Sequence, residues 1–155
     1  MSKKKITNLI IGSNNLGKIR EIKHLLPVNL KIYTPKKLNI KSPKENGKTF
    51  KENSLIKAKF FSRKSKLVCL ADDSGLEIDI LKKKPGIFSS RWAGKKGNFN
   101  NAIKKIFKQL SKKDKNWEKK KIRARFVCVL SIYWPDGKNF SSIGKIEGFI
   151  SPNKK

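Results

Sequence analysis

The sequence predicts an α/β protein: a mixed, twisted β-sheet with helices packed on it and a long β-hairpin near the C-terminus. Three observations carry this prediction. An apolar run at 6–11 leads through a polar loop into an amphipathic segment, the order strand, loop, helix. A second amphipathic segment, 50–65, leads into the apolar run 67–71. Two long segments with strand character, 121–134 and 139–150, flank a Pro-Asp-Gly-Lys turn.

The first half of the chain follows this order element by element. The first strand stops at Gly12, and Pro27 ends the helix that follows. The apolar face of that helix consists of Ile19, Ile22, Leu25 and Leu26. Residues 30–33 suit a second strand, and the polar stretch 35–48 predicts an irregular connection. Thr49 has Glu three residues after it, the pattern of a capping box, so a second helix begins there.

The second half predicts smaller elements before the hairpin. Residues 77–81 alternate between polar and apolar and suit a strand or an extended arm, 82–86 form a turn, and 89–94 form a polar and aromatic loop. Asn98 is placed to cap a further helix. The apolar face of that helix consists of Ile103, Ile106, Phe107 and Leu110. The charged stretch 112–121 connects it to the hairpin.

The length and the charge of the chain limit the classes of protein to which it can belong. A chain of 155 residues predicts a single domain over 1–155. Its 39 Lys and Arg against 11 Asp and Glu give a net charge of +28, which suggests a nucleic-acid-binding protein. All but five of these basic residues are Lys, spread along the chain, and Lys, Asn and Ile share AT-rich codons. We therefore favour a bias in genome composition as the origin of the positive charge. Under either explanation, the positive electrostatic potential of the protein would attract a small polyanionic substrate.

The cysteines and the apolar runs predict the compartment. Cys69 and Cys128 fall in predicted strands without the spacing of metal ligands, which predicts buried free thiols in a reducing compartment. No apolar run approaches the length of a membrane span, and the basic start is followed by too short an apolar stretch for a signal peptide. We expect a soluble, cytoplasmic protein.

Two adjacent acids follow the apolar run 67–71 directly. Asp72 and Asp73, then Ser74 and Gly75, stand at the carboxyl end of a predicted buried strand. Carboxylates there cost solvation energy and require cations, donors or a chemical role. In open α/β sheets, ligands bind at that end of the strands. Asp, Ser and Gly also favour turns, so this stretch alone leaves a turn and a functional site equally open.

A second group of polar residues lies near the N-terminus. The loop 13–18, Ser-Asn-Asn-Leu-Gly-Lys, joins a strand to a helix, an arrangement that offers backbone N–H groups and a lysine to phosphates. It lacks the second glycine and the Ser/Thr of a P-loop, so an ordinary connecting loop stays an alternative. Glu45 stands alone among lysines, and Asn53 and Lys57 share a helix face. Two or three acids with lysines nearby suit metal-assisted phosphate chemistry, and oxygen ligands favour Mg²⁺ over zinc.

Five blocks of sequence, in order along the whole chain, resemble the inosine triphosphate pyrophosphatase family, the noncanonical purine nucleoside triphosphate pyrophosphatases. The blocks are SNNLGK at 13–18 with Glu21, ENGKTF at 45–50, ENSLIKAK at 52–59, ADDSGLEID at 71–79 and PGIFSSRWAG at 85–94. The resemblance implies hydrolysis of dITP, ITP and XTP to the monophosphate and pyrophosphate. It also implies Mg²⁺ as the cofactor and a homodimer as the assembly.

The resemblance implies a role for each matching position. The substrate-binding residues would be Ser13, Asn14, Asn15, Leu16, Gly17, Lys18, Lys57, Ser74 and Arg91. Glu45 and Asp73 would bind the metal, and Asp73 would also act as the base for the attacking water. Asp72 would be a second catalytic acid at the metal or its water shell. Neighbouring acids can titrate as a pair, so the sequence does not separate Asp72 from Asp73 as the general base.

The C-terminus departs from the family pattern. Family members continue past the segment that matches 147–150, with a Phe-Gly-Tyr-Asp-Pro block and a Ser-His-Arg block that recognise the base and close the pocket. This sequence stops at Lys155 without them. A frameshift or a broken gene fragment is one hypothesis, and the DNA downstream of Lys155 tests it, because it should then encode a Phe-Gly-Tyr-Asp-Pro block in some frame. If the chain ends at Lys155, we expect weak or absent activity, poor base selectivity and an unpaired sheet edge. The alternatives are a pyrophosphatase of similar fold for other nucleotides, an inactive fragment and a basic nucleic-acid-binding protein.

Overall fold

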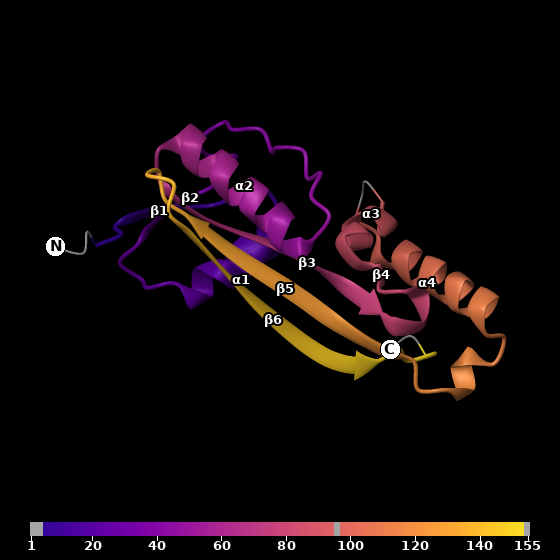
Figure 1. Cartoon of the computed structure of the whole chain (residues 1–155). Coiled ribbons are helices and arrows are strands. Elements are labelled where there is room, and N and C mark those ends of the chain that lie inside the picture. The colour runs from indigo at the N-terminus through magenta and orange to yellow at the C-terminus, as the bar shows by residue number, and fades with distance from the viewer. Residues whose placement is uncertain (1–4, 95–96, 154–155) are drawn as a thin grey trace. The chain divides into compact units, whose positions relative to one another are not determined.

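The computed structural model of the chain describes residues 5–94 and 97–153 (Figure 1). It divides into two compact units, which we call the first unit (Met1–Asp73 with Val129–Ser142) and the second unit (Ser74–Cys128 with Ile143–Lys155). Three strands run through both units. That residues 1–155 act as a single domain stays a prediction.

The sheet is mixed, as the sequence predicts. Its strands are β1 (Asn8–Ile11), β2 (Lys31–Tyr33), β3 (Val68–Ile78), β4 (Lys84–Pro85), β5 (Arg123–Tyr133) and β6 (Asn139–Phe149). The order is β2-β1-β3-β5-β6, and β4 pairs with β3 outside this path. β1 pairs in parallel with β2 and with β3, whereas β4 runs antiparallel to β3. The long predicted hairpin is formed by β5 and β6.

Two helices cover the two faces of β1 in the first unit (Figure 1). Successive strand residues point to opposite faces. Ile22 of α1 (Leu16–Leu25) packs with Leu9 and Ile11, and Phe61 of α2 (Phe50–Ser65) packs with Ile10. The side chains of Asn15 and Thr49 cap the two helices, each accepting hydrogen bonds from backbone N–H groups of the first turn. The predicted cap at Thr49 is therefore confirmed.

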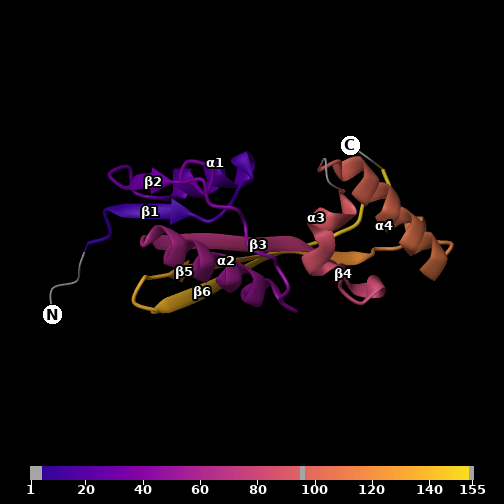
Figure 2. The same cartoon turned by 90° about the horizontal axis from the view of Figure 1, so that it is seen from above.

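The second unit is built around α4 (Phe99–Lys113), which lies beside the short helix α3 (Ser89–Trp92) (Figure 2). Ile106 and Leu110 of α4 pack with Ile78 and Trp117 in the core of this unit. Asn98 caps α4 by accepting a hydrogen bond from the Asn100 N–H, as the sequence predicts. The unit also contains 3-10 helices at Asp79–Leu81, Gly86–Phe88 and Trp117–Lys119.

Two local predictions in the second unit are wrong. Residues 89–94, predicted as a loop, begin with α3, and residues 77–81 leave the strand after Ile78 to form a 3-10 turn. The hydrogen bonds of Ser89 explain why a helix, and not a loop, begins at this residue. Its Oγ donates to the Gly86 carbonyl at 2.6 Å and accepts the Leu76 N–H at 2.9 Å, which fixes the start of α3 beside β3.

The two cysteines differ in exposure. Cys69 is buried and Cys128 is exposed, and neither forms a disulfide, so the prediction of buried thiols holds for Cys69 alone. Burial raises the pKa of the Cys69 thiol to about 12, which keeps it protonated and unreactive. Among the described residues, no helix has the length and apolar character needed to cross a membrane.

Candidate active site

Asp72 and Asp73 lie inside β3, which continues through both residues to Ile78. The turn alternative for this stretch is therefore wrong. The last β1–β3 partners are Ile11 and Leu70, so the two acids begin after one intervening residue, just past the end of β1. Both side chains are buried, with residue exposures of 4% and 7%. The parallel pairing brings the end of β1, where the loop 13–18 starts, next to these acids.

The loop 13–18 has a shape fixed by its own side chains. The Ser13 Oγ accepts the Asn15 N–H at 3.1 Å. The Asn15 Oδ1 in turn accepts the N–H groups of Gly17 and Lys18 at 2.9 and 3.2 Å, which caps α1. Ser13 is 8% exposed, so it lies at the buried root of the loop. These contacts direct the start of α1, where backbone N–H groups attract anions, toward the end of the sheet.

The remaining loop residues face outward or hold the loop from the side. The Asn14 Nδ2 donates to Ser42 Oγ at 2.8 Å, and Leu16 is 72% exposed. Gly12 joins the loop to β1. A Cβ on Gly12 would lie 2.8 Å from a ring carbon of Phe61, so the close contact between β1 and α2 requires glycine here.

Lys18 connects the loop to the acid pair. Its Nζ lies 2.5 Å from Asp72 Oδ2, and the side-chain exposures are 32% for Lys18 and 6% for Asp72. The ammonium group of Lys18 offsets part of the cost of burying the Asp72 carboxylate. The loop and the acids, 54 positions apart, are therefore parts of one site.

Asp73 lies in a different environment from Asp72. Its Oδ2 is buried and has no hydrogen-bond partner among the described residues. Burial raises the pKa of Asp73 to about 6, although the nearby charge of Lys57 and a hydrogen bond from Asn53 both lower it. The charge of Glu45 raises this pKa further, and that of Lys18 lowers it. A buried carboxylate oxygen without a donor is costly, and a cation or a water is the partner that would offset the cost.

α2 supplies the cation and the amide beside Asp73. Asn53 is 1% exposed and Lys57 is 9% exposed. The Asn53 side chain donates a hydrogen bond to Asp73 and accepts the Gly47 N–H at 2.9 Å. The Lys57 Nζ lies 3.4 Å from Glu45 Oε1. Both contacts hold the loop that carries Glu45 against α2.

Asn53 and Gly47 are the residues to which sequence reasoning assigned no role. A Cβ on Gly47 would lie 2.7 Å from Asn53 Oδ1 and 2.7 Å from Glu52 Cβ, so only glycine fits this approach. Asn53 and Lys57 share a helix face, but that spacing is common on solvated helices. The sequence did contain one signal for a role of Asn53. Asn53 and Lys57 lie on the face of α2 that must also pack on the sheet, where polar side chains are unusual.

The structure brings most of the predicted residues together in the first unit. The loop 13–18, Glu45, Lys57 and the pair Asp72 and Asp73 form this cluster through the contacts described above. Ser74 and Arg91 belong to the second unit. Ser74 is half-buried and follows Asp73 in β3, and the guanidinium carbon of Arg91 lies 4.8 Å from the centre of the Phe88 ring.

Comparisons with known proteins give consistent results. The model of the Ham1 family matches residues 9–155. The chain is 44% identical over 130 residues to a dITP/XTP pyrophosphatase of Zymomonas mobilis, covering 83% of this chain and 61% of that protein. It is 40% identical over 144 residues to a dITP/XTP pyrophosphatase of Rhodospirillum centenum, covering 92% of this chain and 70% of that protein. The chain thus spans less than two thirds of the first relative's length.

Solved structures agree on the fold. A Ham1 protein from Coxiella burnetii superposes with a TM-score of 0.85 at 31% identity, covering 97% of this chain and 76% of that one. The Staphylococcus aureus Ham1 protein gives a TM-score of 0.81 at 32% identity, covering 96% of this chain and 74% of that one. The mixed α/β fold predicted from the sequence is confirmed.

Proposed function

The chain belongs to the Ham1 family, and from this membership and the site geometry we propose that it hydrolyses noncanonical purine nucleoside triphosphates. The substrates would be dITP, ITP and XTP, and the products the monophosphate and pyrophosphate. The observation that carries the proposal is the contact between Lys18 of the loop 13–18 and the buried acid Asp72, with Asp73 beside it. This contact supports a site in which the loop would bind phosphates beside carboxylates that would hold a metal and a water.

The triphosphate would bind to the loop 13–18 and to the lysines around it. Backbone N–H groups at the start of α1 and the ammonium groups of Lys18 and Lys57 would neutralise the phosphates, and the leaving pyrophosphate would stay with them. The carboxylate of Asp72 contacts the ammonium group of Lys18 and would hold it in position. Ser74 and Arg91, which belong to the second unit, stay predicted substrate-binding residues.

The residues fit Mg²⁺ as a cofactor. Among the described residues, no three acidic, His or Cys side chains are grouped as a metal cluster. Mg²⁺ usually needs only one or two carboxylates, because waters and substrate phosphates complete its shell. Asp73 offers a buried carboxylate oxygen that no donor of the described part of the chain reaches, and the charge of Glu45, on the adjacent loop, raises the pKa of Asp73. These two residues would hold the metal, which would neutralise charge on the triphosphate.

Asp73 is also the better candidate for the general base. Its raised pKa of about 6 leaves it ionised at neutral pH and close enough to that pH to accept a proton from water. Asp72 lies in contact with Lys18 instead. We therefore assign water activation to Asp73 and the placement of Lys18 to Asp72, with the hydrogen bond from Asn53 orienting Asp73.

The proposal extends to assembly and location. We infer a homodimer that works in the cytoplasm, where nucleoside triphosphates are made and where damaged purine nucleotides must be removed. The net charge of +28 would attract such polyanionic substrates.

Pyrophosphate release tests the proposed function. The purified chain is incubated with Mg²⁺ and, separately, with dITP, ITP, XTP, dGTP, dATP and a pyrimidine triphosphate. We expect release from the first three, and loss of that release in Asp73→Asn. Faster release from dGTP, dATP or the pyrimidine triphosphate than from dITP would indicate a pyrophosphatase for other nucleotides. Release from dITP that Asp73→Asn leaves unchanged would refute the role of Asp73.

A further inference from the structure

The hydroxyl group of Ser89, the first residue of α3, makes two hydrogen bonds. Its Oγ accepts the Leu76 N–H of β3 at 2.9 Å and donates to the Gly86 carbonyl at 2.6 Å. Leu76 and Ser89 are 13 positions apart, so the first bond is a tertiary contact. A hydroxyl that accepts from one partner and donates to another has a fixed orientation. These bonds therefore hold the start of α3 against β3.

Leu76 lies where one edge of β3 passes from one partner strand to the next. Pairing with β1 ends at Leu70, and pairing with β4 begins at Glu77. The carbonyls of Leu70 and Ile78 both accept hydrogen bonds on this edge. Backbone groups of alternate residues point to the same edge of a strand, so the Leu76 N–H points there as well. Ser89 thus supplies an acceptor at a position between the two partner strands.

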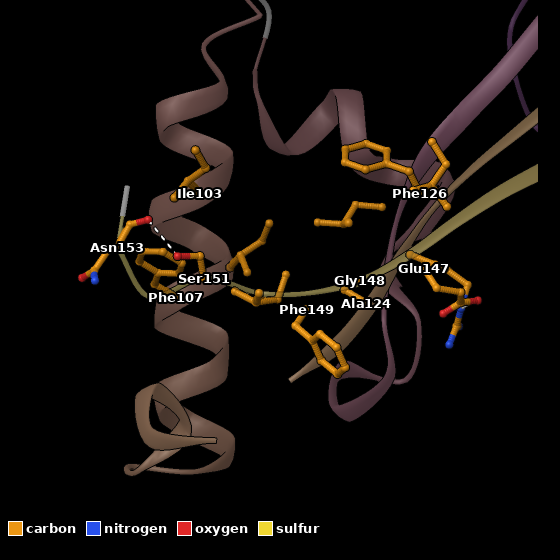
Figure 3. A pocket seen from close by; sticks show the side chains of 14 residues that line it. Ile103, Phe107, Ala124, Phe126, Glu147, Gly148, Phe149, Ser151 and Asn153 are labelled. Carbon is orange, nitrogen blue, oxygen red and sulfur yellow. Dashed lines mark hydrogen bonds and ion pairs between the residues drawn. The ribbon is translucent and has the colours of Figure 1, made fainter. Parts of the chain in front are cut away.

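α3 is also held to the core of the second unit. Leu76 of β3 and Trp92 of α3 both pack against this core. The Leu76 side chain lines a cavity of about 620 Å³ with Ile103 and Phe107, which Figure 3 shows on α4. Apolar packing is non-directional, whereas a hydrogen bond has a preferred angle. The core therefore holds α3 in place, and the bond from Leu76 to Ser89 decides how the helix is turned.

Arg91 lies between these two anchors. Ser89, two positions before it, is bonded to β3, and Trp92, directly after it, packs against the core. The Arg91 guanidinium carbon lies 4.8 Å from the centre of the Phe88 ring, which is exposed. A guanidinium group binds phosphates through a rigid fork of N–H groups, so its direction matters as much as its charge. The direction of Arg91 follows from the way in which α3 is turned.

We propose that Ser89 is a positioning residue that acts through Arg91, because its bond to β3 aims the Arg91 guanidinium at a phosphate of the nucleoside triphosphate. The proposal rests on the proposed function, in which Arg91 stays a predicted substrate-binding residue. Ser74, predicted to bind the substrate as well, precedes Leu76 by two positions in β3. The bond from Leu76 to Ser89 therefore also sets where Arg91 lies relative to Ser74, both within the second unit.

Replacing Ser89 tests this role. Ser89→Ala removes both hydrogen bonds, and we expect the KM for dITP to rise about tenfold, because a displacement of about 1 Å is enough to weaken an oriented contact. The kcat should stay within about twofold, since Arg91 would bind the substrate without taking part in proton transfer. Ser89→Thr keeps the hydroxyl group and should keep KM close to that of the unaltered chain.

Ser65→Ala is the matched control. At the C-terminal end of α2, the Ser65 Oγ makes the same pair of bonds, donating to the Phe61 carbonyl at 2.7 Å and accepting the Leu67 N–H at 3.2 Å. Its loss should lower the urea concentration at the midpoint of unfolding, as the loss of the Ser89 hydroxyl does. The KM for dITP should stay unchanged in Ser65→Ala. A rise in KM is therefore expected only where the lost bonds position Arg91.

A double variant separates positioning from a general loss of stability. If Ser89 acts through Arg91, Ser89→Ala combined with Arg91→Ala has the KM of Arg91→Ala alone, because no guanidinium is left to be aimed. Hydrogen exchange of the Leu76 N–H, followed by NMR, checks the bond itself. This N–H should exchange faster in Ser89→Ala than in the unaltered chain and should stay protected in Ser89→Thr.

The outcomes separate this role from the proposed function. An unchanged KM in Ser89→Ala would overturn the positioning role, and so would increases in KM that multiply in the double variant. If the unaltered chain releases no pyrophosphate from dITP, the proposed function is refuted. The Kd for a dITP analogue with an imido group between the α and β phosphates, measured by calorimetry, then replaces KM, and the same ratios between variants are expected. A chain that does not bind this analogue would refute both proposals.

Discussion

At the scale of residues, Asp72 and Asp73 are neighbours whose side chains point to opposite faces of β3. Asp72 meets Lys18 at the start of α1, and Asp73 receives a hydrogen bond from Asn53 on α2. α1 and α2 pack on opposite faces of β1. Each acid therefore contacts the helix that covers its own face of the sheet. Asp72 is paired with the ammonium group of Lys18, whereas the hydrogen-bond partner of Asp73 is the neutral amide of Asn53.

Asp73→Asn should make the protein more stable at neutral pH in the absence of metal. The pKa of Asp73 is raised from 3.8 to about 6 in the folded chain, so the folded state binds this proton more tightly than the unfolded chain does. The contribution of Asp73 to stability is therefore lost as the pH rises from about 4 to about 6. We expect up to about 3 kcal/mol of added stability at pH 7.5 in urea unfolding. The gain should vanish near pH 4, and a gain that is independent of pH would contradict the assignment.

Lys18→Met should destabilise the protein, and Asp72→Asn in the same chain should restore it. The single change leaves a buried carboxylate without its cation, which we expect to cost about 1 to 3 kcal/mol because Lys18 is partly exposed. The double variant removes both charges. If Lys18 also binds the triphosphate, the KM for dITP should stay high in the double variant, although urea unfolding shows that its stability has recovered. Recovery of KM together with stability would assign Lys18 a purely structural role.

At the scale of elements, α2 and the loop before it act together. Asn53 joins the Gly47 backbone to Asp73, and Lys57 contacts Glu45. The buried amide of Asn53 thus holds Asp73, and the ion pair with Lys57 holds Glu45. These are the two carboxylates that we assign to the metal.

Gly47→Ala should raise the Mg²⁺ concentration needed for half-maximal activity. The added methyl would lie 2.7 Å from Asn53 Oδ1, so the loop that carries Glu45 must shift away from α2. We expect an increase of about tenfold in the Mg²⁺ requirement, with a smaller change in KM for dITP at saturating metal. Asn46→Ala, an exposed neighbour in the same loop, is the matched control. A Mg²⁺ requirement that stays unchanged in Gly47→Ala would refute the role of this contact.

Three serines connect α2 to the hairpin. The Ser54 Oγ donates to the Lys51 carbonyl at 3.0 Å, so it must accept the hydrogen of Ser131, whose Oγ lies 2.6 Å away. The Ser131 Oγ in turn lies 2.7 Å from Ser141 Oγ and accepts from it. Ser131→Ala should cost about 1 to 3 kcal/mol in urea unfolding, because it removes a buried link with two partners. Ser141→Ala should cost clearly less, since Ser141 is half-exposed, and equal costs would contradict this direction of bonding.

The sequence predicted the elements whose signals are local. Apolar periodicity and side-chain caps placed α1, α2, α4 and the hairpin, and the loop 13–18 and the acids were recognisable as parts of a site. β3 continues through Asp72 to Gly75, although these residue types favour turns, because pairing with neighbouring strands outweighs local preference. The bridge from Gly47 through Asn53 to Asp73 depends on three segments that meet in space, and no spacing along the chain encodes it.

At the scale of the whole molecule, the net charge of +28 has two explanations that differ in a measurable way. If the charge reflects genome composition alone, the lysines far from the site should have no effect on catalysis. A field that steers substrate predicts that association with a polyanionic nucleotide depends on ionic strength. The site itself contains lysines on both sides of the acids, so the local and the global contributions must be separated.

The kcat/KM for dITP should fall by about tenfold between about 20 and 300 mM salt at fixed free Mg²⁺, and the fall should lie in KM. Salt screens the attraction between distant lysines and the triphosphate, whereas the chemical step takes place among buried groups that salt hardly reaches. A variant with Glu at positions 104, 108 and 112, three exposed lysines of α4, should show a smaller dependence on salt with the same kcat. An equal salt dependence in this variant would show that the lysines beside the acids alone attract the substrate, and that the rest of the positive charge reflects composition.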